Sequence, residues 1–184
     1  MAQQSVMAQR AVEQRATGRP QWTTVVVLLA LALAVVGVGI AAYLAYENLQ
    51  GDAGACTITK GCSTVQKSSY GKLLGVPVSV PGLLLYLALA GAAVAWLRNL
   101  GGQRELITFG AFFGALFGLG FSAYLTYVEA FVLNAWCIYC IVSALIMGAL
   151  FLAWGSLFAY IYRQHRQEDA LESPRPAARS RKRR

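Results

Sequence analysis

Residues 130–162, AFVLNAWCIYCIVSALIMGALFLAWGSLFAYIY, form the longest stretch of the chain that lacks a charged residue. A helix of roughly 20 predominantly apolar residues crosses the hydrocarbon core of a bilayer, so this stretch is long enough to span a membrane. Three more long uncharged stretches occupy 20–46, 73–97 and 106–128. We therefore predict an all-α membrane protein, a bundle of four transmembrane helices at about 23–46, 80–98, 106–128 and 138–161.

The composition supports this class, because 57% of the 184 residues are hydrophobic and 13% are charged, whereas a soluble domain carries about 25% charged residues. The first uncharged stretch follows Arg10, Arg15 and Arg19, as the apolar core of a secretory signal follows its basic segment. Such a core is usually about 7–15 residues long, which the first stretch clearly exceeds. We therefore interpret it as a membrane helix that stays in the protein.

The distribution of basic residues predicts the orientation of the bundle. Of the 16 Lys and Arg residues, 13 precede the first helix, lie between the second and third helices, or follow the fourth. The other three, Lys60, Lys67 and Lys72, belong to the segment between the first two helices. Basic residues are enriched in cytoplasmic loops, so we expect both termini in the cytoplasm, with 47–79 and 129–136 facing outward. The protein is then a multi-pass protein of the inner or plasma membrane.

We expect one folded domain, because no long polar insert separates the helices. This membrane domain covers 23–162, with the outer loop at 47–79, and a cytoplasmic tail over 1–22 precedes it. The basic tail over 163–184 contains the proline-rich stretch ESPRPAARS and is predicted to be disordered. Its end, RSRKRR, is typical of a topology signal that contacts anionic lipid in the bilayer, and we expect no nucleic-acid partner.

All four cysteines fall in segments that we expect to face outward, on the oxidising side of the membrane. Cys56 and Cys62 lie in the outer loop, in CTITKGC, and Cys137 and Cys140 open the fourth helix, in CIYC. Residues three apart share a helix face, and the N-terminus of a helix stabilises a thiolate. The CIYC pair can therefore be reactive without a neighbouring base. The only histidine, His165, is predicted at the cytoplasmic side, which excludes a Cys–His pair.

Two other uses of the cysteines are open alternatives. Four thiolates can form a tetrahedral zinc site, but CTITKGC has five residues between its cysteines, more than the usual spacing of roughly two to four, and we expect no metal. Structural disulfides are the second alternative, although a CxxC bridge closes a very small loop and constrains the unfolded chain little. Two outward pairs favour a redox relay between a soluble thiol protein and a lipid-soluble carrier such as a quinone.

In this arrangement the chain resembles the bacterial homologues of vitamin K epoxide reductase, which form disulfides by reducing a quinone. The resemblance covers about residues 25–160 and rests on three features in order. These are the loop pair Cys56 and Cys62, the stretch SSYGKLLGVPVSVPGLLLY that leads into the second helix, and CIYC at the start of the fourth. The resemblance implies a four-helix bundle around a quinone, menaquinone or ubiquinone, with the outer loop capping the quinone site.

The resemblance also implies a role for each cysteine. Cys56 would exchange with a thioredoxin-like protein, Cys62 would be able to bridge to Cys137, and Cys140 would face the quinone. Ser68, six residues after the second loop cysteine, would help to hold the quinone.

Several aromatic residues near the outer end of the bundle are typical of an interfacial belt. We expect some of them to line the quinone site as well, with Tyr139 and Phe131 as the candidates. The full set is Tyr124, Tyr127, Phe131, Trp136 and Tyr139.

The chain departs from the animal members of the family, which reduce vitamin K epoxide. Those members have an Asn before the second helix and a Tyr four residues after the CxxC, where this chain has Val78 and Ala144. Neither side chain can hydrogen-bond a quinone oxygen. We therefore expect plain quinone reduction coupled to disulfide formation, with reduction of vitamin K epoxide or vitamin K quinone as an alternative.

Two further expectations concern the partner and the direction of electron flow. Many bacterial members carry a fused thioredoxin-like domain, but 22 residues follow the fourth helix here, so we expect the thioredoxin-like partner to be a separate protein. A transmembrane carrier of reducing power is another alternative. It would require cysteines on the cytoplasmic side, and the sequence offers none there.

Two local patterns predict how the helices pack and begin. Gly110, Gly114 and Gly118 recur at every fourth residue, which allows another helix to approach closely, either within the bundle or in a dimer. Pro81 is tolerated in the first turn of a helix and marks the start of the second one. The apolar stretch before it, Tyr70–Val76, is predicted to form a short half-helix that shields the site.

Overall fold

The computed structural model describes residues 20–50, 65, 68–73 and 75–172. Four of its helices are long and apolar enough to cross a membrane, which confirms the predicted four-helix membrane bundle. They are α2 (Gln21–Gln50), α4 (Ser79–Leu97), α5 (Arg104–Tyr127) and α6 (Ile138–Glu172). Shorter elements join them: 3₁₀ turns at Ser69–Gly71 and Leu100–Gly102, a π-helix at Val128–Val132, and the strands β1 (Lys72–Leu73) and β2 (Val76–Pro77).

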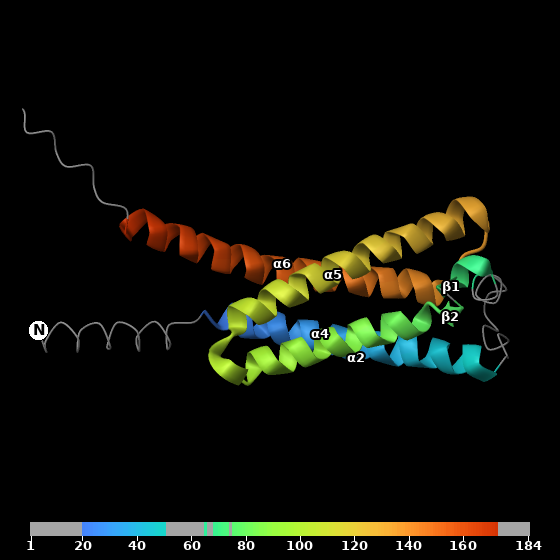
Figure 1. Ribbon diagram of the computed structural model, residues 1–184, viewed down its shortest axis with the longest axis horizontal. Coiled ribbons are helices and arrows are strands. Elements are labelled where there is room, and N and C mark those ends of the chain that lie inside the picture. Colours follow the sequence, from blue (N-terminus) through green and yellow to red (C-terminus); the bar gives the residue numbers. More distant parts are fainter. Residues whose placement is uncertain (1–19, 51–64, 66–67, 74, 173–184) are drawn as a thin grey trace, which may run out of the picture.

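The four long helices form two antiparallel pairs, and in Figure 1 the two helices of each pair cross. α2 packs mainly against α4, and α5 packs mainly against α6. The start of α2, the turn between α4 and α5, and the end of α6 lie at one end of the bundle, whereas β1, β2 and the start of α6 lie at the other (Figure 1). The basic residues Arg98 and Arg104 of the turn therefore share an end with Arg163 and Arg166, and CIYC lies at the opposite end.

The turn between α4 and α5 is fixed by side chains as well as by backbone. Asn99 and Gly102 adopt left-handed conformations, with φ of 53° and 67°, which reverse the chain within a few residues. Arg104 donates from Nε to the Trp96 carbonyl oxygen at 2.9 Å, and its guanidinium lies 4.9 Å from the centre of the Trp96 ring. At the same end, Glu105 pairs with His165 at 3.1 Å, so the single histidine lies far from the CIYC cysteines.

The core of the bundle runs along its centre. Its largest fully buried side chains include Trp154, Tyr86, Leu150 and Leu157, and all four long helices contribute residues to it. Each helix buries one stripe and leaves other apolar side chains outside, such as Leu152, of which 70% is exposed. Lipid tails are as apolar as leucine, so such exposed residues are expected where a helix faces the bilayer.

The glycine repeat of α5 permits close packing at one of its three positions. A Cβ atom at Gly118 would lie 2.7 Å from Met147 Sδ and 2.8 Å from Leu85 Cδ2, which is too close. At Gly114 the nearest side-chain atom would be at 3.6 Å, an ordinary contact, and Gly110 faces open space. Packing within the bundle is therefore confirmed for Gly118, whereas Gly110 has no such role.

We predict that Gly37→Ala destabilises the protein by about 1–3 kcal/mol, as overpacking does in other cores. A Cβ atom at Gly37 would collide with the Tyr86 ring, whose hydroxyl is hydrogen-bonded to Ser143 at 2.8 Å. Gly39→Ala is the matched control, because a Cβ there meets no atom within 4 Å and alanine favours a helix over glycine by about 1 kcal/mol. Thermal unfolding in detergent should shift in opposite directions for the two variants, and equal shifts would contradict the prediction.

The segment before α4 differs from the predicted half-helix. Its first part is a single 3₁₀ turn, and β1 and β2 then pair as a short antiparallel hairpin. Gly75, with φ of +85°, turns this hairpin. Glycine and proline both oppose a helix, and the presence of Gly75 and Pro77 explains why Tyr70–Val76 does not form one. α4 begins at Ser79, so Pro81 lies in its first turn as predicted.

The ends of two other helices also differ from prediction. α6 continues to Glu172, so residues 163–172 of the predicted disordered tail are helical. They include Arg, Gln, Glu, Ala and Leu, which are strong helix formers. α5 continues directly into the π-helix up to Val132, within the predicted outward loop 129–136. A charged residue marks where the apolar stretch stops, but the backbone can remain helical beyond it.

Candidate active site

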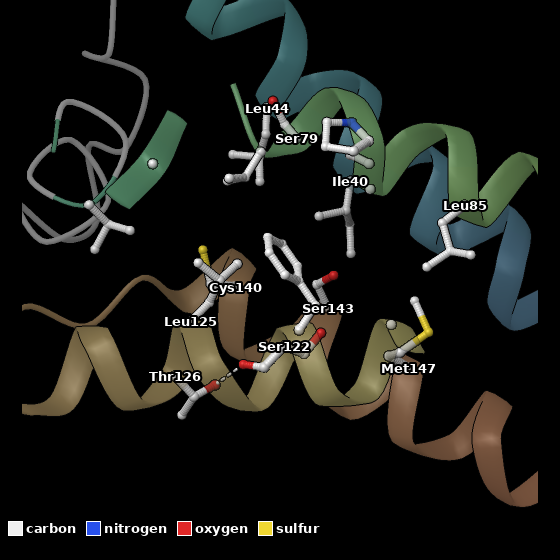
Figure 2. Close-up of a pocket in the computed structure, with 18 of the residues that line it drawn as sticks. Ile40, Leu44, Ser79, Leu85, Ser122, Leu125, Thr126, Cys140, Ser143 and Met147 are labelled. Carbon is white, nitrogen blue, oxygen red and sulfur yellow. Dashed lines mark hydrogen bonds between the residues drawn. The ribbon is translucent and has the colours of Figure 1, made fainter. Parts of the chain in front are cut away.

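An apolar cavity of about 260 Å³ lies between the helix pairs, near the start of α6. Figure 2 shows Ile40 and Leu44 of α2 and Ser79 of α4 on one side, with Ser143 and Cys140 of α6 on the other. All four long helices thus contribute to the wall, together with Val65 and the 3₁₀ turn before β1. The cavity is therefore a product of the tertiary fold and not of any one segment.

The two CIYC cysteines occupy different environments. The Cys137 carbonyl oxygen accepts a hydrogen bond from Ile141 N at 3.0 Å, so Cys137 stands at the start of α6 and Cys140 lies one turn further. The Cys137 side chain is fully buried and packs with Val65. Cys140 lines the cavity (Figure 2). The pair thus links a buried sulfur, close to the outer loop, with a sulfur that a cavity ligand can reach.

The connection between α5 and α6 positions this pair. Leu133 N donates to the Val128 carbonyl oxygen at 2.9 Å, the hydrogen bond of a π turn, and Ala135 N donates to the Glu129 carbonyl oxygen at 3.1 Å. Asn134 has a left-handed conformation with φ of 47°, which redirects the chain into α6. The π turn and the Asn134 bend together return the backbone from α5 to the cavity within a few residues.

Glu129 is buried beside both cysteines, with 1% of its surface exposed. Its Oε2 accepts a hydrogen bond from the backbone N of Cys137 at 3.1 Å. The two sulfurs and a carboxyl oxygen all lie within 4.8 Å of one another. The other oxygen, Oε1, has no hydrogen-bond partner among the described residues.

Glu129 is not among the site residues that the sequence predicts. A signal was available, because Glu129 is the one charged residue between positions 106 and 162. A charge inside a membrane segment is costly and by default marks a functional site. Glu129, Cys137 and Cys140 offer three possible metal ligands, one fewer than a structural zinc site uses. Within the described residues the group therefore resembles an open redox pair with a carboxylate more than a closed metal site.

Hydroxyl groups supply most of the remaining polarity of the cavity. The Tyr86 hydroxyl is hydrogen-bonded to Ser143, at 2.8 Å from Oγ and 3.0 Å from the carbonyl oxygen. Thr126 donates to the Ser122 carbonyl oxygen at 2.9 Å (Figure 2). Ser79 Oγ is buried and has no hydrogen-bond partner among the described residues. Ser79 thus offers a buried hydroxyl that a ligand could use without breaking a hydrogen bond to a described residue.

Of the four residues expected to hold a quinone, the structure places Cys140 in the cavity wall and the other three outside it. Ser68 donates from Oγ to the Val65 carbonyl oxygen at 2.7 Å and accepts from Gly71 N at 3.2 Å, so its hydroxyl is used by the local turn. Phe131 lies on the π-helix and is 73% exposed. The loop cysteines Cys56 and Cys62 lie outside the described residues.

Tyr139 is also turned away from the cavity and packs against Tyr43, with ring centres 5.7 Å apart. The aromatic residues of the wall are instead Tyr70, Tyr86, Phe117 and Phe121. They come from the turn before β1 and from the middle of α4 and α5, and the distances along the chain give no hint that they share a cavity.

Comparison with known protein families gives a match over most of this chain. The model of the vitamin K epoxide reductase family, whose oxidoreductases use a quinone as electron acceptor or substrate, matches residues 28–154. The matched region contains all four cysteines, Glu129 and every described residue of the cavity wall. Because it also spans more than half of the sequence, the chain belongs to the vitamin K epoxide reductase family of membrane oxidoreductases.

Proposed function

We propose that this protein is a thiol:quinone oxidoreductase that reoxidises a separate thioredoxin-like protein outside the cytoplasm and so supports disulfide formation. Electrons would pass from the partner to Cys56 and Cys62, then to Cys137 and Cys140, and then to menaquinone or ubiquinone from the membrane pool. The observation that carries the proposal is the position of Cys140, which lines an apolar cavity one helical turn from the buried Cys137.

The cavity suits a quinone because a quinone combines an apolar ring and tail with two hydrogen-bond-accepting oxygens. Apolar side chains such as Leu85, Phe117 and Phe121 would contact the ring or tail, and Ser79 offers a donor. A dithiol that becomes a disulfide loses two electrons and two protons, the number that one quinone accepts. A strong disulfide-forming oxidant has a potential near −120 mV, so an acceptor of comparable or higher potential is needed, and quinones meet this requirement.

We predict that Ser79→Ala raises the KM for quinone roughly 3- to 10-fold, the value of one neutral hydrogen bond, and leaves kcat nearly unchanged. The Ser79 hydroxyl is buried without a described partner, and Ser79 is one of the residues that line the cavity, so a hydrogen bond to a quinone oxygen would offset its lost hydration. Ser156→Ala on the exposed side of α6 is the matched control. Steady-state kinetics with a short-chain quinone measure both parameters, and an unchanged KM would assign the quinone oxygen to another donor.

Reduction of vitamin K epoxide is less favoured, because Val78 lines the cavity where animal members carry an Asn that can hydrogen-bond the substrate. A transmembrane carrier of reducing power is also less favoured. The described cysteines, Cys137 and Cys140, lie at the same end of the bundle, opposite Arg98 and Arg104 (Figure 1), and a carrier needs a thiol at both ends.

We predict that both termini face the cytoplasm of a cell whose inner or plasma membrane holds the protein. Arg98, Arg104, Arg163 and Arg166 share one end of the bundle, and basic residues favour the cytoplasmic side. A reporter that is active only outside the cytoplasm should be inactive when fused after Arg184 and active when inserted into the segment 51–64. Activity of the fusion at the C-terminus would contradict this orientation.

The proposed function is tested most directly with purified protein in detergent. A reduced thioredoxin-like protein and a quinone are added, and the loss of quinone absorbance is followed. We expect catalytic quinone loss together with oxidation of the thioredoxin-like protein in equal amounts. A folded protein that oxidises no thiol and consumes no quinone, with several thioredoxin-like donors and both quinone types, would overturn the proposal.

A further inference from the structure

We infer that Glu129 is a catalytic residue of this protein, the base that accepts the protons of the Cys137 and Cys140 thiols while they are oxidised. The inference rests on the proposed function, because it assigns a role within the reaction with quinone. It adds a proton path to a site that the sequence defined by its cysteines alone.

The geometry places Glu129 beside the reacting atoms. An oxygen of its carboxyl group lies within 4.8 Å of both the Cys137 and the Cys140 sulfur. Oε2 is held by the Cys137 backbone N–H at 3.1 Å, which fixes the group on the sulfur side. Oε1 has no hydrogen-bond partner among the described residues. A proton could therefore bind this oxygen without breaking a hydrogen bond to any of them. Glu129 also lines the cavity, so the same group faces thiol and ligand.

A structural role does not explain why this position holds a carboxylate. The Cys137 N–H needs one acceptor, and a neutral amide or carbonyl oxygen would satisfy it without placing a charge in an apolar segment. A buried ion without a counter-ion costs several kcal/mol. Of the described residues, those that line the cavity include no Lys, Arg or His, so no cation in the described wall compensates Glu129.

The low polarity of the cavity makes an internal base useful. A proton that moves from Cys140 to Glu129 shifts a negative charge between two neighbouring groups and leaves the net charge of the site unchanged. Release of the same proton to water would instead add a second buried negative charge, which is strongly unfavourable. The remaining titratable groups of the described wall are the phenols Tyr70 and Tyr86. Glu129 is therefore the one carboxylate among the described residues of the wall.

The overall step balances with Glu129 regenerated. The two thiols lose two electrons and two protons and form the Cys137–Cys140 disulfide, and the quinone leaves as hydroquinone. Glu129 accepts the proton of Cys140 as its thiolate forms and passes it to the cavity, where it ends on a quinone oxygen. Restored to a carboxylate, Glu129 then accepts the proton of Cys137 as the S–S bond closes, and that proton ends on the second oxygen.

The first test is a single turnover of fully reduced protein mixed with quinone in a stopped-flow instrument. Glu129→Gln keeps an oxygen acceptor for the Cys137 N–H but cannot take a proton, and we expect it to slow quinone reduction about 10²- to 10⁴-fold, the usual contribution of general acid–base catalysis. Glu129→Asp should restore part of the rate. Glu105→Gln, on the exposed far end of the same helix, is the matched control and should react like the wild type.

The second test needs no quinone and separates a base from a merely structural carboxylate. In reduced protein with Cys137→Ser, mass spectrometry follows the alkylation of Cys140 by iodoacetamide. If Glu129 removes the thiol proton, Glu129→Gln slows alkylation at least about 10-fold. If Glu129 acts only through its charge, it disfavours the neighbouring thiolate, and Glu129→Gln speeds alkylation instead.

The outcomes separate this inference from the proposed function. If the wild-type protein fails to reduce quinone in a single turnover, the proposed function is wrong, whatever the alkylation rates are. A wild type that reduces quinone, combined with a Glu129→Gln variant that reacts as fast, would overturn the role of Glu129 alone. Thermal unfolding and circular dichroism of Glu129→Gln check that the bundle is intact, and if that variant unfolds, the Glu129→Asp protein is compared with the wild type in both assays.

Discussion

Replacement of Cys140 by serine is expected to leave the bundle folded and to abolish quinone reduction. Loss of a catalytic nucleophile costs on the order of 10⁶-fold in turnover in a serine protease, and here the serine also removes one of the two sulfurs that must form the disulfide. Cys140 is the described cysteine in the cavity wall, whereas Cys137 is fully buried. A quinone in this cavity can therefore meet Cys140 and not Cys137.

The measurement is quinone absorbance during a single turnover of reduced protein, with circular dichroism as the check on folding. A hydroxyl is smaller than a thiol by a fraction of a methyl group, so the substitution should cost little stability. Ser156→Ala, an exposed change on the same helix, controls for general effects on α6 and should keep the full rate. Turnover of Cys140→Ser near the wild-type rate would move the quinone-facing role to another residue.

The number and order of the membrane helices could be predicted from the sequence because each crosses the membrane on an uncharged stretch. A charge inside a bilayer is expensive, so the limits of such stretches are reliable signals for a span. They are weaker signals for where a helix ends. α6 runs on to Glu172 through charged residues that favour a helix, and the charge at Glu129 was interpreted as the start of a loop although the helix continues there.

The cysteines of the site could be predicted because the CxxC motif, which is typical of redox-active cysteines, consists of four consecutive residues. The cavity wall could not, because it combines side chains from helices that are distant along the chain. Ser68 was chosen by its distance along the chain from Cys62, but its hydroxyl is already hydrogen-bonded to Val65 and Gly71. Phe131 shows a second limit, since it lies within the π turn, whose extra residue per turn changes which side chains face inward.

The position of Val65 bears on the proposed relay between the two cysteine pairs. Val65 packs directly against the buried Cys137, and Cys62 is three residues earlier in the sequence. Three residues of chain span at most about 11 Å, so this tether allows Cys62 to reach Cys137. Cys56 is six residues further from Val65 than Cys62 is, and it is the loop cysteine that the internal bridge does not need.

Replacement of Cys62 by serine is accordingly expected to trap the thioredoxin-like partner on Cys56 as a mixed disulfide. Disulfide exchange proceeds by attack of a thiolate on one sulfur of a disulfide. In the wild type the Cys62 thiolate would release the partner from Cys56, and the serine hydroxyl cannot. Non-reducing gels with peptide mapping should show the trapped complex in most of the protein, against little in the wild type. Cys56→Ser is the matched control and should trap no partner.

The same exchange chemistry predicts a different trapped species when Cys140 is replaced by serine. Cys62 and Cys137 should then accumulate as an internal disulfide, because Cys140 is the thiol that would attack Cys137 and release Cys62. The burial of Cys137 favours this result, since a buried disulfide is poorly accessible to an external thiol. Peptide mapping of the oxidised variant should find the Cys62–Cys137 bridge as the main product. A partner protein trapped on Cys137 would instead mean that the outer protein reaches CIYC directly, and the loop pair would then not act as a relay.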